Sequence, residues 1–149
     1  MKIINRHFKR EFEVLDQLEA GIVLSGAEVK SVKAGNIRLE KSFAKIIGEE
    51  VFLVNAEIQI YRFARPLGYD PTKMRKLLLH RKEIVKLMTK IQSSGKLTLV
   101  PRACYTKGRR IKISLALVKG RGEIAKKKLE MKEDIKRAQE KEMKEYLKN

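Results

Sequence analysis

Residues 111–118, with the sequence IKISLALV, carry the clearest structural pattern of the chain. Large apolar side chains stand at the odd positions, so one face of an extended segment would be apolar. Such alternation with a period of two is typical of a half-buried β-strand. Lys107-Gly108, just before this segment, predicts a hairpin turn, and residues 97–100 predict its partner strand, with Pro101 at the end of that strand, at an edge or a bulge.

Two further regions of the chain have the composition of strands. Residues 12–24 mix apolar and acidic residues around Gly21, which predicts two short strands around a turn or bulge. Residues 42–60 are rich in β-branched and apolar residues on either side of Gly48-Glu49, which predicts a second hairpin. Residues 61–71 contain prolines and glycine among basic and aromatic residues, which predicts an irregular loop.

Two helices are predicted between these strands. Ser25 and Glu28 have the spacing of a capping box, in which each side chain binds the backbone N–H of the other residue, and Gly35 would follow the end of this short helix. A second helix is predicted from apolar residues at positions i, i+3, i+4 and i+7, and Gly95 would end it. These apolar residues are Ile84, Leu87, Met88 and Ile91.

The order of these elements predicts the fold class. Several short strands with inserted helices, and no repeated strand–helix–strand unit, indicate a mainly β chain. We expect a small antiparallel barrel of the oligonucleotide-binding type over residues 1–118. Residues 119–149 are highly charged and too poor in apolar residues to form a core, so we expect a basic C-terminal tail that is disordered, or helical when bound.

The chain is strongly basic. Its 149 residues contain 35 Lys and Arg against 18 Asp and Glu, which gives a net charge of +17 and a pI near 10.1. Such a charge favours a polyanionic partner, because each neutralised phosphate also releases condensed counterions. Nucleic acid is the partner that we expect, and an anionic membrane surface is the competing interpretation.

The positive charge gathers in three segments. Residues 72–90 hold seven basic residues and one acid, Glu83. A solvated helix face is the alternative interpretation of this segment, but the scarcity of acids favours phosphate binding. The other two segments, residues 5–10 with Phe8 and residues 102–112 with Tyr105, place basic groups beside rings. This combination suits RNA, because unpaired bases stack on aromatic and guanidinium planes.

The sequence offers little for catalysis or metal binding. Its two histidines, His7 and His80, lie far apart, Cys104 is its single cysteine, and no phosphate-binding loop is present. We therefore expect no enzyme activity, no metal and no cofactor. No segment has the apolar run of a membrane span or a signal peptide, so we expect a soluble, cytoplasmic and monomeric protein.

Residues 19–35, EAGIVLSGAEVKSVKAG, resemble the signature EAGIxLxGxEVKSxRxG of the SsrA-binding protein family, SmpB. Further segments that match the family in order and spacing are residues 42–44, 75–84 and 97–101, and residues 118–122 resemble the start of its tail motif. The resemblance covers about residues 5–122. It implies a small barrel that binds the tRNA-like part of transfer-messenger RNA and delivers it to stalled bacterial ribosomes, where the unfinished peptide is tagged for degradation.

The resemblance also implies the contacts and the partners. The implied transfer-messenger RNA surface comprises Asn5, Arg6, Arg10, Glu28, Lys30, Lys33, Arg75, Lys76, His80, Arg81 and Lys82. Glu28 would act both in the helix cap and toward RNA. The implied partners are transfer-messenger RNA, the 30S and 70S ribosome through the RNA of the decoding centre and the mRNA channel, and, indirectly, elongation factor Tu through charged transfer-messenger RNA.

The tail departs from the family pattern of G-K-K, then His or Tyr, then D-K-R. Residues 120–127 read GRGEIAKK, so the ring and the Asp are missing. By resemblance the tail probes the decoding site and the empty mRNA channel, where its lysines keep phosphate-binding charge. Either Ile124 would pack against a ribosomal base there, or the tail would engage less tightly. The ribosome-facing residues are Gly120, Arg121, Gly122, Ile124, Lys126, Lys127 and Lys128.

Two other interpretations remain open on the sequence alone. Without the resemblance, the residues indicate a basic barrel that binds structured RNA, such as a generic ribosome-associated protein. A membrane-surface protein ranks below it, because the tail lacks the broad apolar face of an interfacial helix.

Overall fold

The computed structural model describes the backbone of residues 1–148, and the side chains of these residues except those at positions 62, 123, 124 and 148. The strands are β1 (Lys2–Ile4), β2 (Phe12–Ile22), β3 (Ile37–Arg38), β4 (Phe43–Ile47), β5 (Glu50–Val54), β6 (Glu57–Ile58), β7 (Arg75–Leu78), β8 (Leu97–Lys107) and β9 (Arg110–Gly120). The helices are α1 (Phe8–Glu11), α2 (Gly26–Lys33), the short 3-10 helix η1 (Arg62–Ala64), α3 (Arg81–Ser94) and α4 (Glu123–Lys148).

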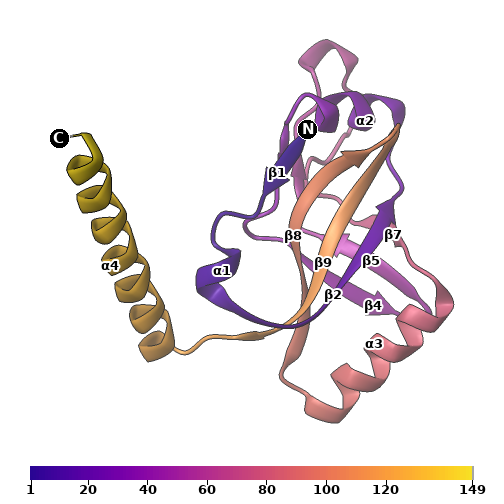
Figure 1. Cartoon of the computed structure of the whole chain (residues 1–149). Coiled ribbons are helices and arrows are strands. Elements are labelled where there is room, and N and C mark those ends of the chain that lie inside the picture. Colours follow the sequence, from indigo (N-terminus) through magenta and orange to yellow (C-terminus); the bar gives the residue numbers. More distant parts are fainter. Residues whose placement is uncertain (149) are drawn as a thin grey trace.

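The main sheet closes on itself. Its strands pair in the order β1-β8-β4-β5-β7-β2-β9, and β8 also pairs with β9, so the sheet from β8 to β9 forms a ring with β1 added to the outer edge of β8 (Figure 1). Each of these pairings is antiparallel. The predicted mainly β, antiparallel barrel with inserted helices is confirmed. Closure leaves fewer unpaired strand edges on the surface.

The predicted hairpin around Gly108 is the longest pairing of the barrel. β8 and β9 pair from Leu97↔Lys119 to Lys107↔Arg110. The odd positions of β9 from Ile111 to Leu117 lie in the main core, as predicted. Ala116 and Val118, on the other face, are also buried, because α1 brings Phe8 over them. This end of β9 is therefore covered on both faces rather than half-buried.

β2 is one continuous strand, so the prediction of two short strands in residues 12–24 is wrong in detail. The bulge lies between Val14 and Asp16, and Gly21 lies inside the strand, opposite Leu78 of β7. A Cβ atom at Gly21 would come within 3.3 Å of the Leu78 Cβ. Gly21 therefore permits the close approach of β2 and β7, not a turn.

The helix boundaries follow the predicted signals. Ser25 and Glu28 form the capping box of α2, and Gly95, in the left-handed conformation with φ 66°, follows the end of α3. Pro101 does not end its strand, because β8 continues through a bulge between Pro101 and Ala103. The apolar run of residues 77–79 is too short to assign from its periodicity, and the structure places Leu77 in β7.

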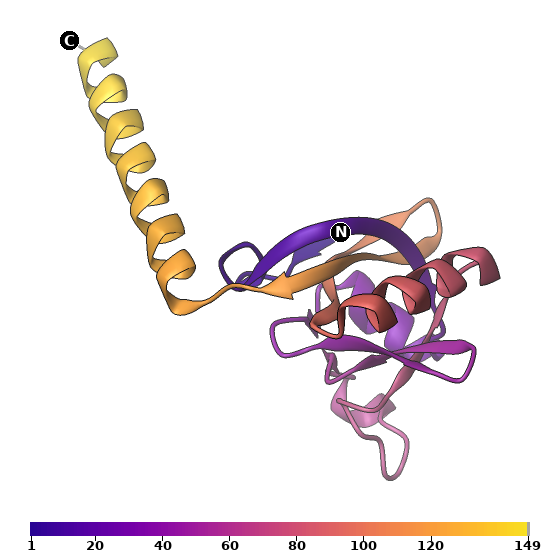
Figure 2. The same cartoon turned by 90° about the horizontal axis from the view of Figure 1, so that it is seen from below.

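The tail forms one long helix. β9 continues to Gly120, and α4 then runs from Glu123 to Lys148 and projects from the barrel (Figure 2). At the rise of an α-helix, these 26 residues extend about 39 Å. No helix in the part of the chain that the structure describes is long and apolar enough to cross a membrane.

Gly21→Ala should lower the unfolding free energy of the barrel. β2 and β7 share the two pairs Gly21↔Leu78 and Ile22↔Leu77, and the added methyl group would lie 3.3 Å from the Leu78 Cβ, so the two strands would have to shift by a few tenths of an ångström. Overpacking of this kind costs about 1–3 kcal/mol of unfolding free energy, which chemical denaturation would measure. Gly120→Ala in β9 is the matched control, because nothing lies within 4 Å of the position that its methyl group would take. Equal stability of the two variants would contradict the role assigned to Gly21.

Candidate nucleic-acid interface

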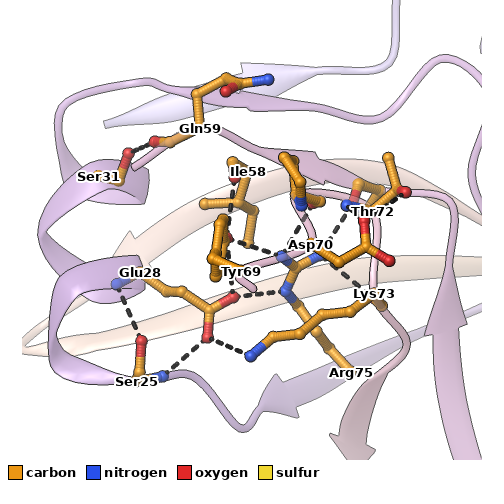
Figure 3. Close-up of polar contacts among 12 residues, drawn as sticks. Ser25, Glu28, Ser31, Ile58, Gln59, Tyr69, Asp70, Thr72, Lys73 and Arg75 are labelled. Carbon is orange, nitrogen blue, oxygen red and sulfur yellow. Dashed lines mark hydrogen bonds and ion pairs between the residues drawn. The ribbon is translucent and has the colours of Figure 1, made fainter. Parts of the chain in front are cut away.

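A buried ion pair joins α2 to β7. The Glu28 Oε2 and Arg75 Nε atoms are 2.6 Å apart, and the two residues are 1% and 3% exposed (Figure 3). The Ser25 N–H donates to the other carboxylate oxygen of Glu28 at 3.0 Å. Arg75 also donates to the carbonyl oxygens of Ala56, at 2.8 Å, and Pro71, at 3.0 Å. Every side of this pair therefore meets a hydrogen-bonding group, as a buried charge requires.

Tyr69 completes this network. Its hydroxyl donates to the Ile58 carbonyl at 2.9 Å and accepts a hydrogen bond from Arg75 Nη2 at 3.1 Å. Burial acts to raise the pKa of Glu28, but the Ser25 N–H and the Arg75 guanidinium outweigh it and hold that pKa below its usual value. The ionised pair thus ties α2, β7 and the loop before β7 together.

The structure places three of the expected RNA-binding residues, Asn5, Glu28 and Arg75, inside the protein. Glu28 and Arg75 use their polar atoms on internal partners, so we assign them to positioning rather than to direct contact with RNA. Sequence reasoning recognised the cap of Glu28 but not its partner, because Arg75 is 47 residues away. It also passed over Tyr69, for which the sole signal was an aromatic residue between two prolines.

Three lysines lie on the elements that this network joins. Lys30 and Lys33 are exposed on α2, whose Ser31 hydroxyl donates to the Gln59 carbonyl. The Lys73 amine lies 3.6 Å from Glu28 Oε1 and 5.5 Å from the centre of the Tyr69 ring, with its side chain 45% exposed. The buried pair thereby holds three cations at one end of the barrel.

Apart from the buried Arg75, the basic residues of β7 and α3 are exposed or half-exposed, and several of them are paired with acids. Lys76 meets Glu50 at 3.2 Å and Arg81 meets Glu49 at 3.1 Å, both on the β4–β5 hairpin. Lys86 and Lys90 both approach Asp16 of β2, and no ion pair of Lys82 occurs among the described residues. The single acid within residues 72–90 did not predict these ion pairs, because their acids lie on other elements. Exposed pairs contribute little and exchange easily, so the cations remain available to phosphates.

His80 shares a groove with the tip of the β8–β9 hairpin. The groove encloses about 700 Å³. It is lined by His80, Glu83, Glu19, Arg109, Arg110 and Lys112, among others. Burial and the Glu19 carboxylate raise the pKa of Tyr105 on this hairpin to about 12. Sequence reasoning noted these hairpin cations as a cluster but did not join them to His80, which the closed barrel brings near.

The N-terminal segment divides into a buried and an exposed part. Asn5 is 3% exposed, and its amide donates to the carbonyls of Pro101, at 3.0 Å, and Leu39, at 3.4 Å. Arg6 is exposed and lines a second groove with Arg38 and other residues. Asn5 therefore anchors the end of β1, while the side chain of Arg6 faces solvent.

The tail helix lies against α1 through ion pairs. Arg10 meets Glu130 at 2.6 Å, Lys9 meets Glu133 at 3.1 Å, and Lys126 meets Glu11 at 2.9 Å. Arg10, expected on the RNA surface, is thus paired with the tail. Lys126 lowers the pKa of Glu11 through its hydrogen bond.

The remaining tail residues lie around the start of α4. The Arg121 N–H donates to the Glu11 carbonyl at 2.9 Å, and its Nε donates to the Lys9 carbonyl at 3.2 Å. Gly120 ends β9, Gly122 precedes α4, and Lys127 and Lys128 are exposed. The Ile124 side chain lies outside the described residues.

Cys104 and the two histidines lie on different elements: Cys104 is in β8, His7 precedes α1 and His80 precedes α3. Burial raises the pKa of the Cys104 thiol to about 12, which keeps it protonated at neutral pH. Within the described residues, no group of three or more His, Cys, Asp or Glu could hold a metal ion.

Glu28→Gln should destabilise the fold strongly. It leaves the Arg75 charge buried without its partner, which costs about 3–5 kcal/mol. The pKa of Glu28 is lower in the folded than in the unfolded chain, so its ionised form stabilises the fold above the usual value of 4.5, and this contribution is lost as the pH falls through the folded-state pKa. The variant should therefore show a smaller loss of stability on acidification, measured by denaturation between about pH 3 and 7.

Glu50→Gln is the control, because it breaks the exposed pair with Lys76 by the same chemical change. It should cost no more than about 1 kcal/mol. Similar losses in both variants would argue against a structural role of the buried pair.

Comparisons with known proteins identify relatives that cover most of the chain. The family model described as SmpB protein matches residues 2–145. The SsrA-binding protein of Sulfurihydrogenibium sp. (strain YO3AOP1) is 42% identical over 144 residues, which cover 97% of this chain and 94% of that protein. The SsrA-binding protein of Chloroflexus aggregans is 44% identical over 134 residues, which cover 89% of this chain and 81% of that protein.

A solved structure shares the fold. It is described as "tmRNA-SmpB: a journey to the center of the bacterial ribosome", and one of its chains is 37% identical to this one, with a TM-score of 0.67 over 82% of this chain and 85% of that chain. The match over most of both chains, together with that to the family model, shows the family. The chain belongs to the SmpB family of SsrA-binding proteins.

Proposed function

We propose that this protein binds the tRNA-like part of transfer-messenger RNA and delivers it to stalled bacterial ribosomes for trans-translation, in which the unfinished peptide is tagged. The observation that carries the proposal is the end of the barrel where the buried Glu28–Arg75 pair joins β7 to α2, which carries the exposed Lys30 and Lys33, with Lys73 beside Glu28. This end includes residues 19–35, the segment with the family signature. The similar solved structure is described by the names of transfer-messenger RNA, SmpB and the bacterial ribosome.

The exposed cations would bind phosphates and so position the RNA. Neutralising several phosphates releases counterions, and this gives affinity without a chemical step. The side chains that we assign to direct contact are Arg6, Arg10, Lys30, Lys33, Lys76, His80, Arg81 and Lys82. Asn5, Glu28 and Arg75 are buried, so their assigned role is to hold the elements that carry those side chains.

The tail would act on the ribosome. We assign α4, with Lys127 and Lys128, to the decoding site and the empty mRNA channel, where ribosomal RNA supplies phosphates. The salt bridges of Glu130 and Glu133 to α1 are exposed or half-exposed, so phosphates would compete for Arg10 and Lys9. Elongation factor Tu would join through the charged RNA rather than through this chain.

A generic structured-RNA-binding protein is the alternative, and the spread of cations over several faces favours it. Titration against transfer-messenger RNA and an unrelated structured RNA, at two salt concentrations, separates the two functions. Specific binding predicts a preference for transfer-messenger RNA that survives higher salt. Equal affinities that fall together with salt would establish phosphate attraction alone.

Charge reversal on α2 should weaken RNA binding. The double substitution Lys30→Glu and Lys33→Glu removes two phosphate contacts and adds repulsion, so the affinity for transfer-messenger RNA should fall at least tenfold, by a rough estimate, and the slope of log K against log salt should become shallower by about 0.9 for each contact. Lys144→Glu, at an exposed position near the end of α4, is the control. An unchanged affinity of the α2 variant would contradict the assigned surface.

Removal of residues 123–149 should separate binding from delivery. The barrel ends with β9 at Gly120, so it should fold without α4 and bind transfer-messenger RNA with an affinity within a few-fold of the full chain. Tagging of peptides on stalled ribosomes should be lost. If truncation abolished RNA binding, the assignment of RNA binding to the barrel and of delivery to the tail would be wrong.

A further inference from the structure

The loop between β6 and β7 exposes a group of apolar and aromatic side chains. Tyr61 is 71% exposed, Phe63 is 83% exposed and Leu67 is fully exposed. The two rings lie next to each other, with their centres 5.4 Å apart and their planes inclined at 59°. These side chains contribute nothing to the core, and clustered exposed apolar groups mark interaction sites.

We propose that the Tyr61 and Phe63 rings form a stacking site for unpaired bases of the transfer-messenger RNA held by the α2 lysines. This inference rests on the proposed function and adds recognition of single-stranded nucleotides to it. Aromatic rings bind any base through its π-face, whereas lysines bind phosphates alone. The loop would therefore distinguish RNA with splayed bases from a fully paired duplex.

The loop is held in place at both ends. Ile60 is buried before it, and the Tyr69 hydroxyl binds the Ile58 carbonyl and Arg75 after it. Within the loop, the Ala64 N–H donates to the Tyr61 carbonyl at 2.9 Å. The buried Glu28–Arg75 pair thus fixes the base of the loop, while the rings of the loop stay in solvent. Such preorganisation reduces the entropy lost on binding.

The charge around the rings favours a polyanion. Arg65 is exposed on the same loop, and residues 61–69 contain no acid. The next acid, Asp70, accepts hydrogen bonds from the Thr72 N–H and hydroxyl, both at 3.0 Å. Gln59, just before the loop, is bound by Ser31 of α2, and the loop lies at the same end of the barrel as α2, which carries Lys30 and Lys33 (Figure 1).

A single tryptophan would report stacking directly. The chain contains no Trp, so Phe63→Trp introduces one fluorophore, whose emission is quenched when a base stacks on it. Titration with the tRNA-like fragment of transfer-messenger RNA should quench this variant. Tyr146→Trp, at a site 78% exposed near the end of α4, should show little change. A fully paired RNA duplex of equal length should quench neither variant.

Loss of the rings should weaken binding selectively. Tyr61→Leu with Phe63→Leu keeps the apolar surface but removes the π-faces, so affinity for the fragment should fall about tenfold or more while affinity for the duplex stays the same. Circular dichroism would check that the variant folds. Unquenched Phe63→Trp emission in a complex that forms normally, or unchanged affinity of the Leu variant, would overturn the stacking site and assign the loop to a protein partner. Failure of the fragment to bind the unmodified protein would instead overturn the proposed function.

Discussion

The buried contact between Glu28 and Arg75 is the constraint on which the arrangement of α2, β7 and the loop before β7 depends. One carboxylate caps the start of α2, accepts from the guanidinium of β7 and attracts Lys73, so a single group fixes three elements. Two charges are removed from water to do this, and the surrounding carbonyls and the Tyr69 hydroxyl offset that cost. An apolar pair would fill the space, but it would not dictate the mutual orientation of these polar groups.

Local signals in the sequence predicted the local structure well. The Ser25–Glu28 box and Gly95 mark helix ends because caps depend on residues three or four positions apart. The alternating apolar residues of β9 likewise predicted one face of the core. The role of Gly21 was misjudged, because it depends on a distant strand, where Gly21 faces Leu78. The bulge at Pro101 was predicted, but the strand does not end there, because β8 stays paired with β9 on both sides of it.

The candidate site was predictable as a set of charges but not as a surface. The family resemblance named residues, yet it did not show that Glu28 and Arg75 face inward while Lys30 and Lys33 face outward. Nor did it show that Asp16 lies beside Lys86 and Lys90 of α3, or that the β4–β5 hairpin brings Glu50 to Lys76 and Glu49 to Arg81. Those distances follow from closure of the barrel, which periodicity along one strand does not specify.

The burial of the Cys104 thiol affects how this protein reacts with oxidants. Oxidants react with thiolates, and a pKa of about 12 in the core leaves almost none at neutral pH. The sulfur atoms within reach of peroxide are instead those of exposed methionines such as Met74, Met131 and Met143. Methionine sulfoxide is repaired by reductases, whereas the higher oxidation states of cysteine are largely irreversible. The fold thus favours the oxidation of methionine, which is reversible, over the oxidation of cysteine.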